Sequence, residues 1–315
     1  MPDPLISVVT TAYNRAHTIG STIDSVQAQT LTDFEHLIAT DAGSSDDTAA
    51  VVDRLAERDD RIRVIHHAHT NQPGGINIGL EKARGRYVCF IDSDDVMLPR
   101  YLELMSAPWR DDPDLGFAYT DAWSLDDATK RVRRRTFLEL YEPRGVPLAS
   151  AEELLTALID LNFISEESTA RRDVIEAVGG FDETMTHSTD YDLWVRVLAH
   201  GFRGTRVPGP LLLHRDSSDS LSKNTAALWE CNRRVMGKLV DELPVSDQIK
   251  QLAGHRIAQL DAGLGMLDHP SAGQRIVASV RRPAGRVKRR LLDRRRHLKT
   301  PPAEVQAAFP DLERV

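Results

Sequence analysis

The first hundred residues alternate short apolar runs with segments whose apolar residues recur at helical spacing. This alternation restricts the fold more than any other feature of the sequence. The apolar runs predict strands at residues 5–11, 34–40, 62–67 and 87–92. Strands that alternate with helices form a largely parallel sheet with helices on both faces. The sequence therefore predicts an α/β fold built on a mostly parallel, Rossmann-like sheet flanked by helices.

The alternation is less regular after residue 112. The segment "LGFAYTDAW" and the segment "RVPGPLLLHR" predict two further strands. Ser150 and Glu153 have the spacing of a capping box, which predicts a helix from there to Asp160. Residues 191–200 predict another helix, and the pattern is helical beyond Thr225.

Polar clusters follow three of the first four predicted strands. Tyr13 and Asn14 follow the first, "DAGSSDDT" follows the second and "DSDD" follows the fourth. In open α/β sheets ligands bind outside the carboxyl ends of the strands, so we expect these clusters to line one crevice. Asp92 and Asp94 are separated by one residue and offer oxygens that suit Mg²⁺ or Mn²⁺, while Asp95 is expected to cap the following turn. A helix N-cap with a solvated turn remains the alternative for this cluster.

The composition is that of a soluble globular protein, with 315 residues of which 41% are hydrophobic and 28% charged. No apolar run approaches the roughly 18 residues of a membrane span, and no basic segment precedes the first apolar run. We therefore expect a cytoplasmic location. The two cysteines, Cys89 and Cys231, are too few for a disulfide framework and lack metal-ligand spacing.

A basic tail occupies residues 275–299, where eleven Lys and Arg face a single acid, Asp293. Its charge of +10 leaves −17 for the remainder, because the whole chain carries −7. A solvated helical arm is one interpretation, and a segment that lies on an anionic inner membrane leaflet is the other. Nucleic acid is not expected as a partner, because the rest of the chain is acidic.

Four motifs occur in a fixed order: "ISVVTTAYNR", "DAGSSDDT", "GGINIGLEKARGRYVCFIDSDD" and "GGFDETMTHSTDYDLWVRVLAHG". Over residues 4–222 this order resembles glycosyltransferase family 2, the inverting enzymes of GT-A fold that use nucleotide-sugar donors. The resemblance implies transfer of a sugar, with uridine diphosphate as the commonest carrier, to a hydroxyl of a sugar or lipid-linked acceptor. Assembly of cell-surface polysaccharide or glycolipid is the expected setting. It also implies a glycosyltransferase domain over 1–222, divided into a donor half (1–110) and an acceptor and catalytic half (111–222), and a helical extension over 223–315.

The resemblance assigns roles to individual positions. Asp190 in "STDYDLW" matches the general base that takes the proton of the acceptor hydroxyl. Asp94 matches the direct ligand of a Mg²⁺ or Mn²⁺ cofactor, with Asp92 near the same metal or the donor's ribose. The nucleotide-sugar pocket is matched by Thr11, Tyr13, Asp41 and Asn77, of which Asp41 bonds the base and Asn77 lies near the diphosphate.

The chain departs from the family pattern at three places. Ala42 stands where many relatives have a second acid after the one matched by Asp41, although forms with a small residue there also fit the family. Ile76 replaces the usual Arg before Asn77, and Arg84 or Arg86 is the expected substitute for the missing cation. Ser217 stands where the family often has a metal-proximal His, so His214 is either an alternative metal ligand or a structural residue. Asp121 and Trp194 are the candidates for the acceptor side, and a core position is the other interpretation of Trp194.

Two other functions remain open at this point. A sugar nucleotidyltransferase also combines an α/β sheet with a metal, but it needs a Gly-rich basic loop after the first strand, and the first glycine there is Gly20. A non-catalytic sugar-nucleotide-binding protein retains the pocket without needing Asp190.

Overall fold

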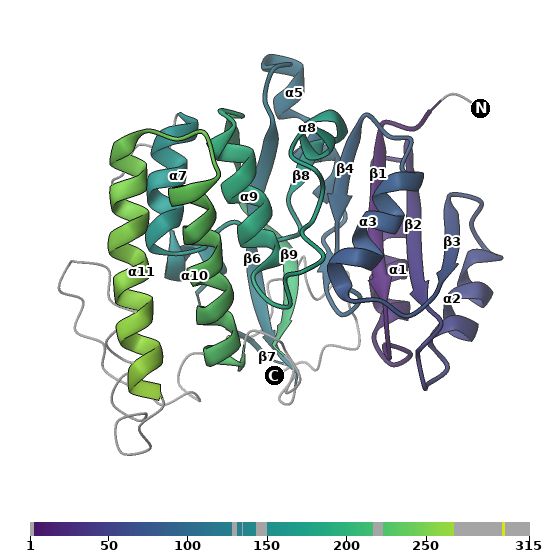
Figure 1. The fold of residues 1–315 in the computed structure, drawn as a ribbon. Helices are drawn as coiled ribbons and strands as arrows, with labels where there is room; N and C mark the ends of the chain where they lie inside the picture. The colour runs from purple at the N-terminus through teal and green to yellow at the C-terminus, as the bar shows by residue number, and fades with distance from the viewer. Residues whose placement is uncertain are drawn as a thin grey trace.

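A computed structural model describes residues 3–127, 131–133, 135–142, 150–216, 223–267 and 298–299. One mixed sheet forms the centre of the molecule, with the strand order β10-β7-β6-β8-β4-β1-β2-β3 and with β9 paired to β6 and β5. Helices cover both faces of this sheet (Figure 1). The α/β fold is therefore confirmed.

The first half of the sheet is parallel, as the sequence predicts. It consists of β1 (Ile6–Ala12), β2 (Phe34–Asp41), β3 (Ile62–His67) and β4 (Tyr87–Phe90). The connecting helices are α1 (Ile19–Gln27), α2 (Thr48–Ala56) and α3 (Gln72–Lys82). The strand β4 ends two residues before the predicted boundary, so Ile91 and Asp92 belong to the following loop.

The second half of the sheet is mixed. Its strands are β5 (Val96–Met97), β6 (Phe117–Asp126), β7 (Arg131–Arg133), β8 (Thr169–Arg171), β9 (Gly204–Asp216) and β10 (Leu298–Lys299). The strand β9 runs parallel to β6, whereas β8 runs antiparallel to β4 and β6. The mostly parallel character predicted from the sequence thus holds for the donor half, and antiparallel pairs enter beyond β4.

Helices complete the second half. They are α4 (Tyr101–Ser106), α5 (Pro108–Asp111), α6 (Phe137–Tyr141), α7 (Ala151–Asp160), α8 (Arg172–Ala177) and α9 (Thr189–Ala199). The predicted capping box of Ser150 and Glu153 is present at the start of α7. It satisfies two backbone N–H groups that a helix start otherwise leaves without a partner.

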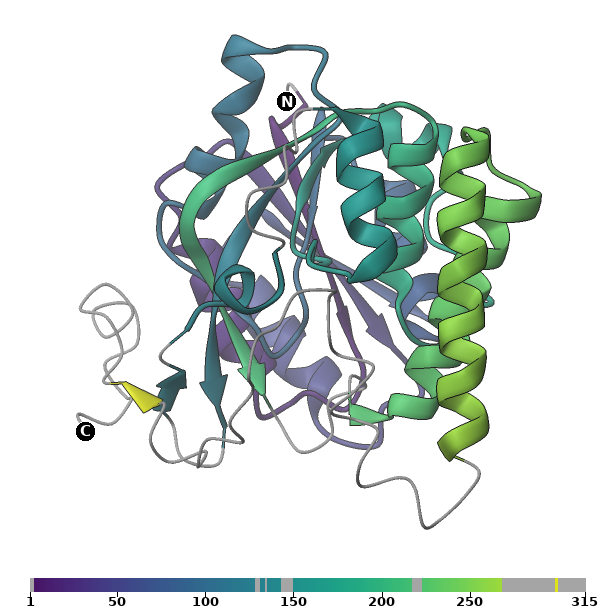
Figure 2. The same ribbon diagram turned by 90° about the vertical axis from the view of Figure 1, so that its left-hand side faces the viewer.

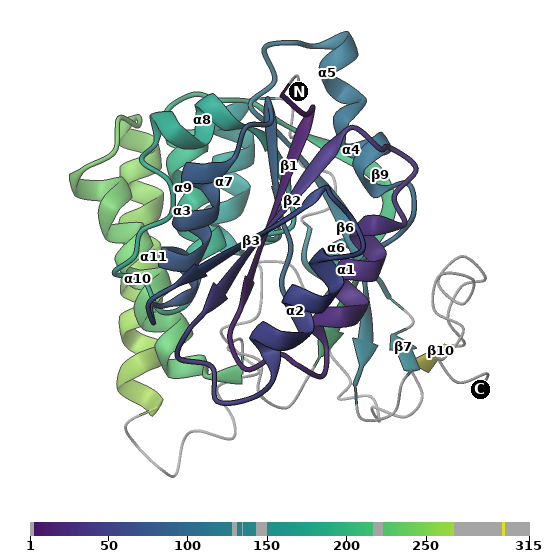
Figure 3. The ribbon, with the colours of Figure 1, turned by 90° about the vertical axis from the view of Figure 1, so that its right-hand side faces the viewer.

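Alternate residues of each central strand point to opposite faces of the sheet. Val9 and Phe90 contribute to the core on one face, whereas Val8 and Cys89 contribute to the core on the other. Figure 3 shows α1, α2 and α4 on one side of the sheet and α3, α7, α9, α10 and α11 on the other. Because both faces are covered, β2 and β4 are buried at every residue and β1 is buried at all but Thr11.

The helix α3 packs very close to β1. A Cβ atom on Gly79 would lie 2.5 Å from Cγ1 of Val9, and one on Gly75 would lie 3.0 Å from Cγ2 of Thr11. Glycine is therefore required for this approach, since any side chain would push the helix away from the strand. The close packing sets the start of α3 beside the carboxyl end of β1.

The helices α10 (Thr225–Asp241) and α11 (Asp247–Leu267) form a hairpin that packs on α9 and α7, with α11 outermost (Figure 2). Val235, Met236 and Leu239 of α10 belong to the same apolar core as Leu193 and Val197 of α9. The first part of the expected extension therefore shares a core with the preceding residues. The basic tail lies outside the described residues except for β10. Among the helices that are described, none combines the length and apolarity that a membrane span requires.

Candidate active site

The carboxyl end of β2 holds Asp41, which is 4% exposed. Its carboxylate accepts hydrogen bonds from the backbone N–H of Gly43 at 2.7 Å and of Thr70 at 3.1 Å, and it contacts Nδ1 of His69 at 3.0 Å. Burial alone would raise the pKa of Asp41, but these hydrogen bonds outweigh it and lower the pKa. Asp41 is therefore an anion held in a fixed position at the carboxyl end of β2.

Tyr13 follows β1 and lies beside His69, the residue that contacts Asp41. Its ring centroid is 5.1 Å from that of His69, and Tyr13 is 46% exposed. Thr11 lies at the end of β1 against Gly75 of α3. An exposed aromatic ring next to a fixed carboxylate is suited to hold a flat heterocycle with N–H donors, because one group offers stacking and the other an acceptor.

The loop after β4 brings three carboxylates into one region. Asp92 accepts a hydrogen bond of 2.8 Å from Nε2 of Gln72, and Asp94 lies 3.9 Å from Nε of Arg15. Burial, together with the charges of Asp94 and Asp95, raises the pKa of Asp92 to about 7. The pKa of Asp94 is also raised, by burial and by the charge of Asp95. Each carboxylate disfavours the ionisation of its neighbours.

Asp95 does not cap the following turn, contrary to the expectation from sequence. It is 1% exposed, and its carboxylate contacts Nδ1 of His214 at 2.6 Å and accepts a hydrogen bond of 2.8 Å from the backbone N–H of Arg215. Burial would raise the pKa of Asp95, but the nearby imidazolium of His214 lowers it, and the charge of Asp95 raises the pKa of His214 well above its usual value. The two side chains form an ion pair that ties β9 to the acidic loop.

Glu166 and Glu167 join the same region and were missed from the sequence. Burial and the charges of nearby carboxylates raise both pKa values well above the usual range, with Asp92 acting on each. Glu167 is 4% exposed. The sequence signal was the pair of adjacent acids in "FISEEST", which follows the helix predicted to end at Asp160.

Asp190 lies in the first turn of α9 and is partly exposed. Its Oδ2 accepts a hydrogen bond of 2.9 Å from Nδ2 of Asn162, in the segment after α7. Ser188, two residues earlier, has a left-handed backbone with φ of 56°, which turns the chain sharply into the helix. Burial raises the pKa of Asp190, and its charge acts in turn on Asp92 and Glu166. The structure therefore brings Asp190 to the acidic loop from almost a hundred residues away.

Asp95, Glu167 and His214 each place one potential ligand atom within 4.8 Å of the others. Carboxylate oxygens with one imidazole nitrogen suit Mg²⁺ or Mn²⁺, and the partly exposed Asp92 and Asp94 lie in the same loop. The raised pKa values indicate a surplus of negative charge, which a divalent cation would relieve. The donor set thus fits the cofactor expected from the sequence.

Asn77 is engaged away from the acidic loop. Its Oδ1 accepts from the backbone N–H of Phe181 and its Nδ2 donates to the carbonyl of Phe181, both at 2.9 Å. The amide thereby fixes the turn that contains Gly179 and Gly180 against α3. The contact with a diphosphate stays a prediction, and the structure gives Asn77 a clear role in holding this turn.

The two residues predicted for the acceptor side, Trp194 and Asp121, are both buried. Trp194 is 0% exposed, stacks on Phe117 with a centroid distance of 4.8 Å and donates from Nε1 to the carbonyl of Ser165. Asp121 is 4% exposed and accepts from the backbone N–H of Leu138 at 2.8 Å. Trp194 is enclosed between α9 and β6, and Asp121 is enclosed between β6 and the start of α6.

Arg84 and Arg86 do not replace the cation missing at position 76. Arg84 bonds Glu35 through Nε at 3.1 Å and Nη2 at 2.9 Å, and the guanidinium of Arg86 lies 5.6 Å from the ring centre of Tyr87. Glu35 and Tyr87 stand at the starts of β2 and β4. Both arginines therefore lie at the opposite end of the sheet from the acidic loop. Arg15 is a cation that does lie at that loop, 3.9 Å from Asp94.

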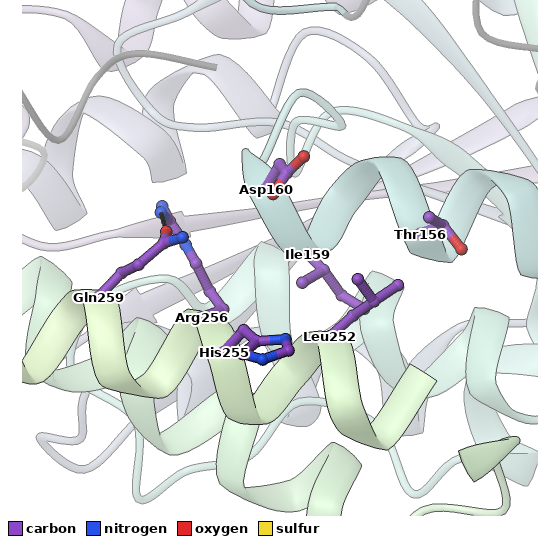
Figure 4. A pocket seen from close by; sticks show the side chains of 7 residues that line it. All are labelled: Thr156, Ile159, Asp160, Leu252, His255, Arg256 and Gln259. Carbon is purple, nitrogen blue, oxygen red and sulfur yellow. Dashed lines mark hydrogen bonds between the residues drawn. The ribbon is translucent and has the colours of Figure 1, made fainter. Parts of the chain in front are cut away.

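A hollow of about 140 Å³ lies between α7 and α11 (Figure 4). Thr156, Ile159 and Asp160 line it from α7, and Leu252, His255, Arg256 and Gln259 line it from α11. None of the predicted site residues lines it, so it is separate from the acidic region.

Acids gathered at the carboxyl ends of parallel strands lie where open α/β sheets bind their ligands. The chain matches the description "Glycosyl transferase family 2" over residues 7–178 and belongs to that family. The family and the fold predicted from the sequence are thereby confirmed.

Two curated relatives show how far the likeness extends. A chondroitin synthase of Escherichia coli is 29% identical over 194 residues, which are 62% of this chain and 26% of that protein. An uncharacterized glycosyltransferase of Methanocaldococcus jannaschii is 24% identical over 217 residues, which are 68% of this chain and 72% of that protein. The matched part thus spans about a quarter of the synthase.

Two solved structures share the fold. The mannosyltransferase PcManGT from Pyrobaculum calidifontis, in complex with GDP-Man and Mn2+, has a TM-score of 0.62 and 18% identity, and the match covers 91% of this chain and 77% of that one. S. aureus TarS 1-349, in complex with UDP-GlcNAc, has a TM-score of 0.58 and 17% identity, with 86% and 74% covered. At these identities the likeness concerns the fold alone.

Proposed function

We propose that this protein is an inverting, metal-dependent glycosyltransferase that moves a sugar from a nucleoside-diphosphate sugar to an acceptor hydroxyl. The observation that carries the proposal is that Asp190, which Asn162 holds in place, lies close enough to the loop after β4 for its charge to act on Asp92. Asp190 is oriented on α9, whereas Asp92 and Asp94 lie after the carboxyl end of β4. Asp190 would thus accept the proton, and the other two carboxylates would lie where the charged leaving group is held.

The donor would be bound across the ends of β1, β2 and β4. Tyr13 and Asp41 would contact the nucleobase, and Thr11 would line the same pocket. Uridine diphosphate is the first candidate from the family resemblance, and guanosine diphosphate is the second, because PcManGT is described with GDP-Man. Asp94 and Asp92 would hold Mg²⁺ or Mn²⁺, and His214 would be a further ligand once it has lost the proton that it shares with Asp95. The ion would offset the negative charge that grows on the departing diphosphate.

Asp190 would act as general base. The acceptor oxygen forms a bond to the anomeric carbon from the face opposite the diphosphate, the bond from that carbon to the phosphate oxygen breaks, and the hydroxyl proton passes to the Asp190 carboxylate. Attack from the opposite face inverts the anomeric configuration. A sensor that only binds the sugar nucleotide would not need a carboxylate oriented in this way.

Donor hydrolysis and transfer to a panel of sugar acceptors, with and without Mn²⁺, test this function. Asp190→Asn should lower the rate by about 10²-fold or more while donor binding persists. Asp173→Asn, at an exposed carboxylate of α8, is the matched control and should behave as wild type. Metal-dependent activity that survives Asp190→Asn unchanged would remove the assignment of the base.

We further propose that the acceptor is a glycan or a lipid-linked sugar at the cytoplasmic membrane surface, reached through the basic tail. The charge of +10 over residues 275–299 supports this, with each basic residue near an anionic surface contributing about 1 kcal/mol. Flotation with vesicles of neutral and anionic lipid tests it in the full-length chain. Replacing Arg286, Arg289, Arg290, Arg294, Arg295 and Arg296 by Gln should abolish binding to the anionic vesicles, and equal binding by both proteins would refute it.

A further inference from the structure

The hollow between α7 and α11 is lined by one face of each helix. The lining residues form two rows, Thr156, Ile159 and Asp160 on α7 and Leu252, His255, Arg256 and Gln259 on α11. Residues three or four positions apart lie on the same face of a helix, so the two rows face each other across the hollow (Figure 4). A different set of α11 residues lies in the core, namely Ile249, Ala253 and Leu260. The hollow therefore lies beside the core, at the surface.

The hollow combines an apolar wall with a polar rim. Ile159 is 2% exposed, and Leu252 packs against the main apolar core. Asp160, His255 and Gln259 are exposed. Nη1 of Arg256 donates a hydrogen bond of 2.9 Å to Oε1 of Gln259, which holds these two side chains together on α11. An apolar wall with a few polar groups that point inward is typical of sites for small organic ligands.

The rim presents donors and acceptors together. Among the residues that the structure describes, the side chains of Asp160 and His255 form neither a hydrogen bond nor an ion pair. Asp160 offers two acceptor oxygens and Arg256 offers N–H donors, and their opposite charges offset each other. A hydroxyl group both donates and accepts, whereas an anion only accepts. The mixed rim therefore suits a neutral sugar better than a phosphate or a carboxylate.

Two short connections join the hollow to the proposed base. Asn162, which donates to Asp190, follows Asp160 by two residues. The hydroxyl of Tyr191, the residue after Asp190, donates to the carbonyl of Leu158 at 2.7 Å. Burial raises the pKa of the Tyr191 hydroxyl, and the charges of Arg256 and Asp160 also act on it. The hollow and the base thus lie on neighbouring parts of α7 and α9.

We propose that the hollow is an acceptor subsite, which binds one neutral sugar residue of an oligosaccharide while the terminal residue of the same chain presents its hydroxyl to Asp190. The inference rests on the function proposed above and specifies its acceptor class, a glycan chain instead of a monosaccharide. The apolar wall would pack against the C–H groups of the bound sugar ring. Arg256, Gln259 and Asp160 would form hydrogen bonds with its hydroxyl groups.

The packing of the helices keeps the subsite at a fixed distance from the base. Leu158 of α7, Leu193 of α9 and Leu260 of α11 belong to one core. An oligosaccharide that contacts both places gains from both sets of contacts, because its second contact is made within the same complex. A monosaccharide reaches only one of them. The affinity for an acceptor should therefore increase with its chain length.

A structural role is the competing explanation for Arg256. Its cation lies near the last turn of α7, where a positive charge interacts favourably with the helix dipole. Loss of that role alone would lower the free energy of unfolding and leave the dependence on chain length unchanged. Loss of a sugar contact would weaken the long chains selectively.

The experiment is an NMR titration of the full chain, with UDP and Mn²⁺ present, against neutral sugars of increasing length. The probes are glucose to cellohexaose, N-acetylglucosamine to chitohexaose, and mannose to mannohexaose. In at least one series, wild type should bind the hexasaccharide at least about tenfold more tightly than the monosaccharide. Arg256→Met should remove most of this gain and leave the Kd of the monosaccharide unchanged. Arg233→Met, at an exposed arginine that pairs with Asp261 away from the hollow, is the matched control and should resemble wild type.

Gln259→Ala provides a second variant, at an exposed side chain whose loss should not alter the stability. It should weaken the hexasaccharide by about threefold to fivefold, because one set of hydrogen bonds is lost. Equal affinity of wild type for monosaccharide and hexasaccharide in all of the series would overturn the inference while leaving the proposed function in place. A gain with chain length that survives both Arg256→Met and Gln259→Ala would overturn it as well. Absence of nucleotide binding and of donor hydrolysis would instead overturn the proposed function, and the acceptor subsite with it.

Discussion

The side-chain amide of Asn162 donates a hydrogen bond of 2.9 Å to Oδ2 of Asp190, joining the segment after α7 to the first turn of α9. This bond both orients the carboxylate and favours its ionised form, since the pKa of Asp190 is raised by burial and lowered by Asn162. Two measurable consequences follow from its removal.

Asn162→Ala should reduce kcat by about tenfold to a hundredfold with little change in donor KM, because a base that is less well oriented removes the proton less efficiently. Loss of the hydrogen bond also raises the pKa of Asp190 further. The acidic limb of the pH–rate profile should therefore move to higher pH, because Asp190 must be ionised to act. A profile with an unchanged acidic limb would contradict this role, and Gln251→Ala on the exposed side of α11 is the control.

Lys238 of α10 is a second case of long-range support. Its ammonium pairs with Asp182 at 2.7 Å and with Asp192 of α9, whose side chain is 0% exposed, while Arg196 holds Asp192 from the same helix. Lys238→Met should lower the free energy of unfolding by about 3–5 kcal/mol, because it leaves a buried carboxylate short of compensating charge. Urea unfolding measures this change.

The matched control is Lys82→Met, at a side chain that is 49% exposed, where we expect a change below about 0.5 kcal/mol. Combining Lys238→Met with Asp192→Asn should recover part of the loss, since the second change removes the unpaired charge. Equal effects of the two lysine substitutions would show that α10 is not held to α9 by this pair.

Asp182 gives the stability a defined dependence on pH. Burial would raise its pKa, but hydrogen bonds from Lys238 and Thr184 outweigh burial and hold the pKa well below the usual range. A carboxyl whose pKa is lower in the folded state stabilises the fold at pH values above its unfolded-state pKa of about 3.9. This stabilisation is lost as the pH falls from that value to the lower folded-state pKa. Asp182→Asn should therefore lower the stability at pH 6 and flatten its decline toward pH 2, as measured by urea unfolding. Asp47→Asn, at an exposed carboxylate, should leave the decline as steep as in wild type.

Trp194→Phe separates a core role from an acceptor role. The substitution removes the hydrogen bond to Ser165 and part of the stacking on Phe117, so the free energy of unfolding should fall by about 1–3 kcal/mol. Acceptor KM should stay at the wild-type value at temperatures where the variant is folded. A rise in acceptor KM without loss of stability would restore the acceptor role that the buried position of Trp194 argues against.

The sequence by itself determined the local features of this protein. Short apolar runs and apolar residues at helical spacing predicted the four parallel strands and their helices. The position of polar residues just after apolar runs predicted which loops meet at the carboxyl ends of the strands. Asp41, Asp92 and Asp94 were found in this way, because they lie at or shortly after the ends of the predicted strands. The family resemblance then added Asp190, which no local pattern connects with the acidic loop.

Only the tertiary structure decided which distant residues meet and which are enclosed. His214 reaches Asp95 over 119 residues of sequence separation, Glu166 and Glu167 enter the acidic region from the segment before β8, and Trp194 and Asp121 are covered by neighbouring elements. Periodicity reports the geometry of a single element. These contacts depend instead on the order of strands in the sheet, their register and the helices that cover each face, which are set by packing between elements far apart in the chain.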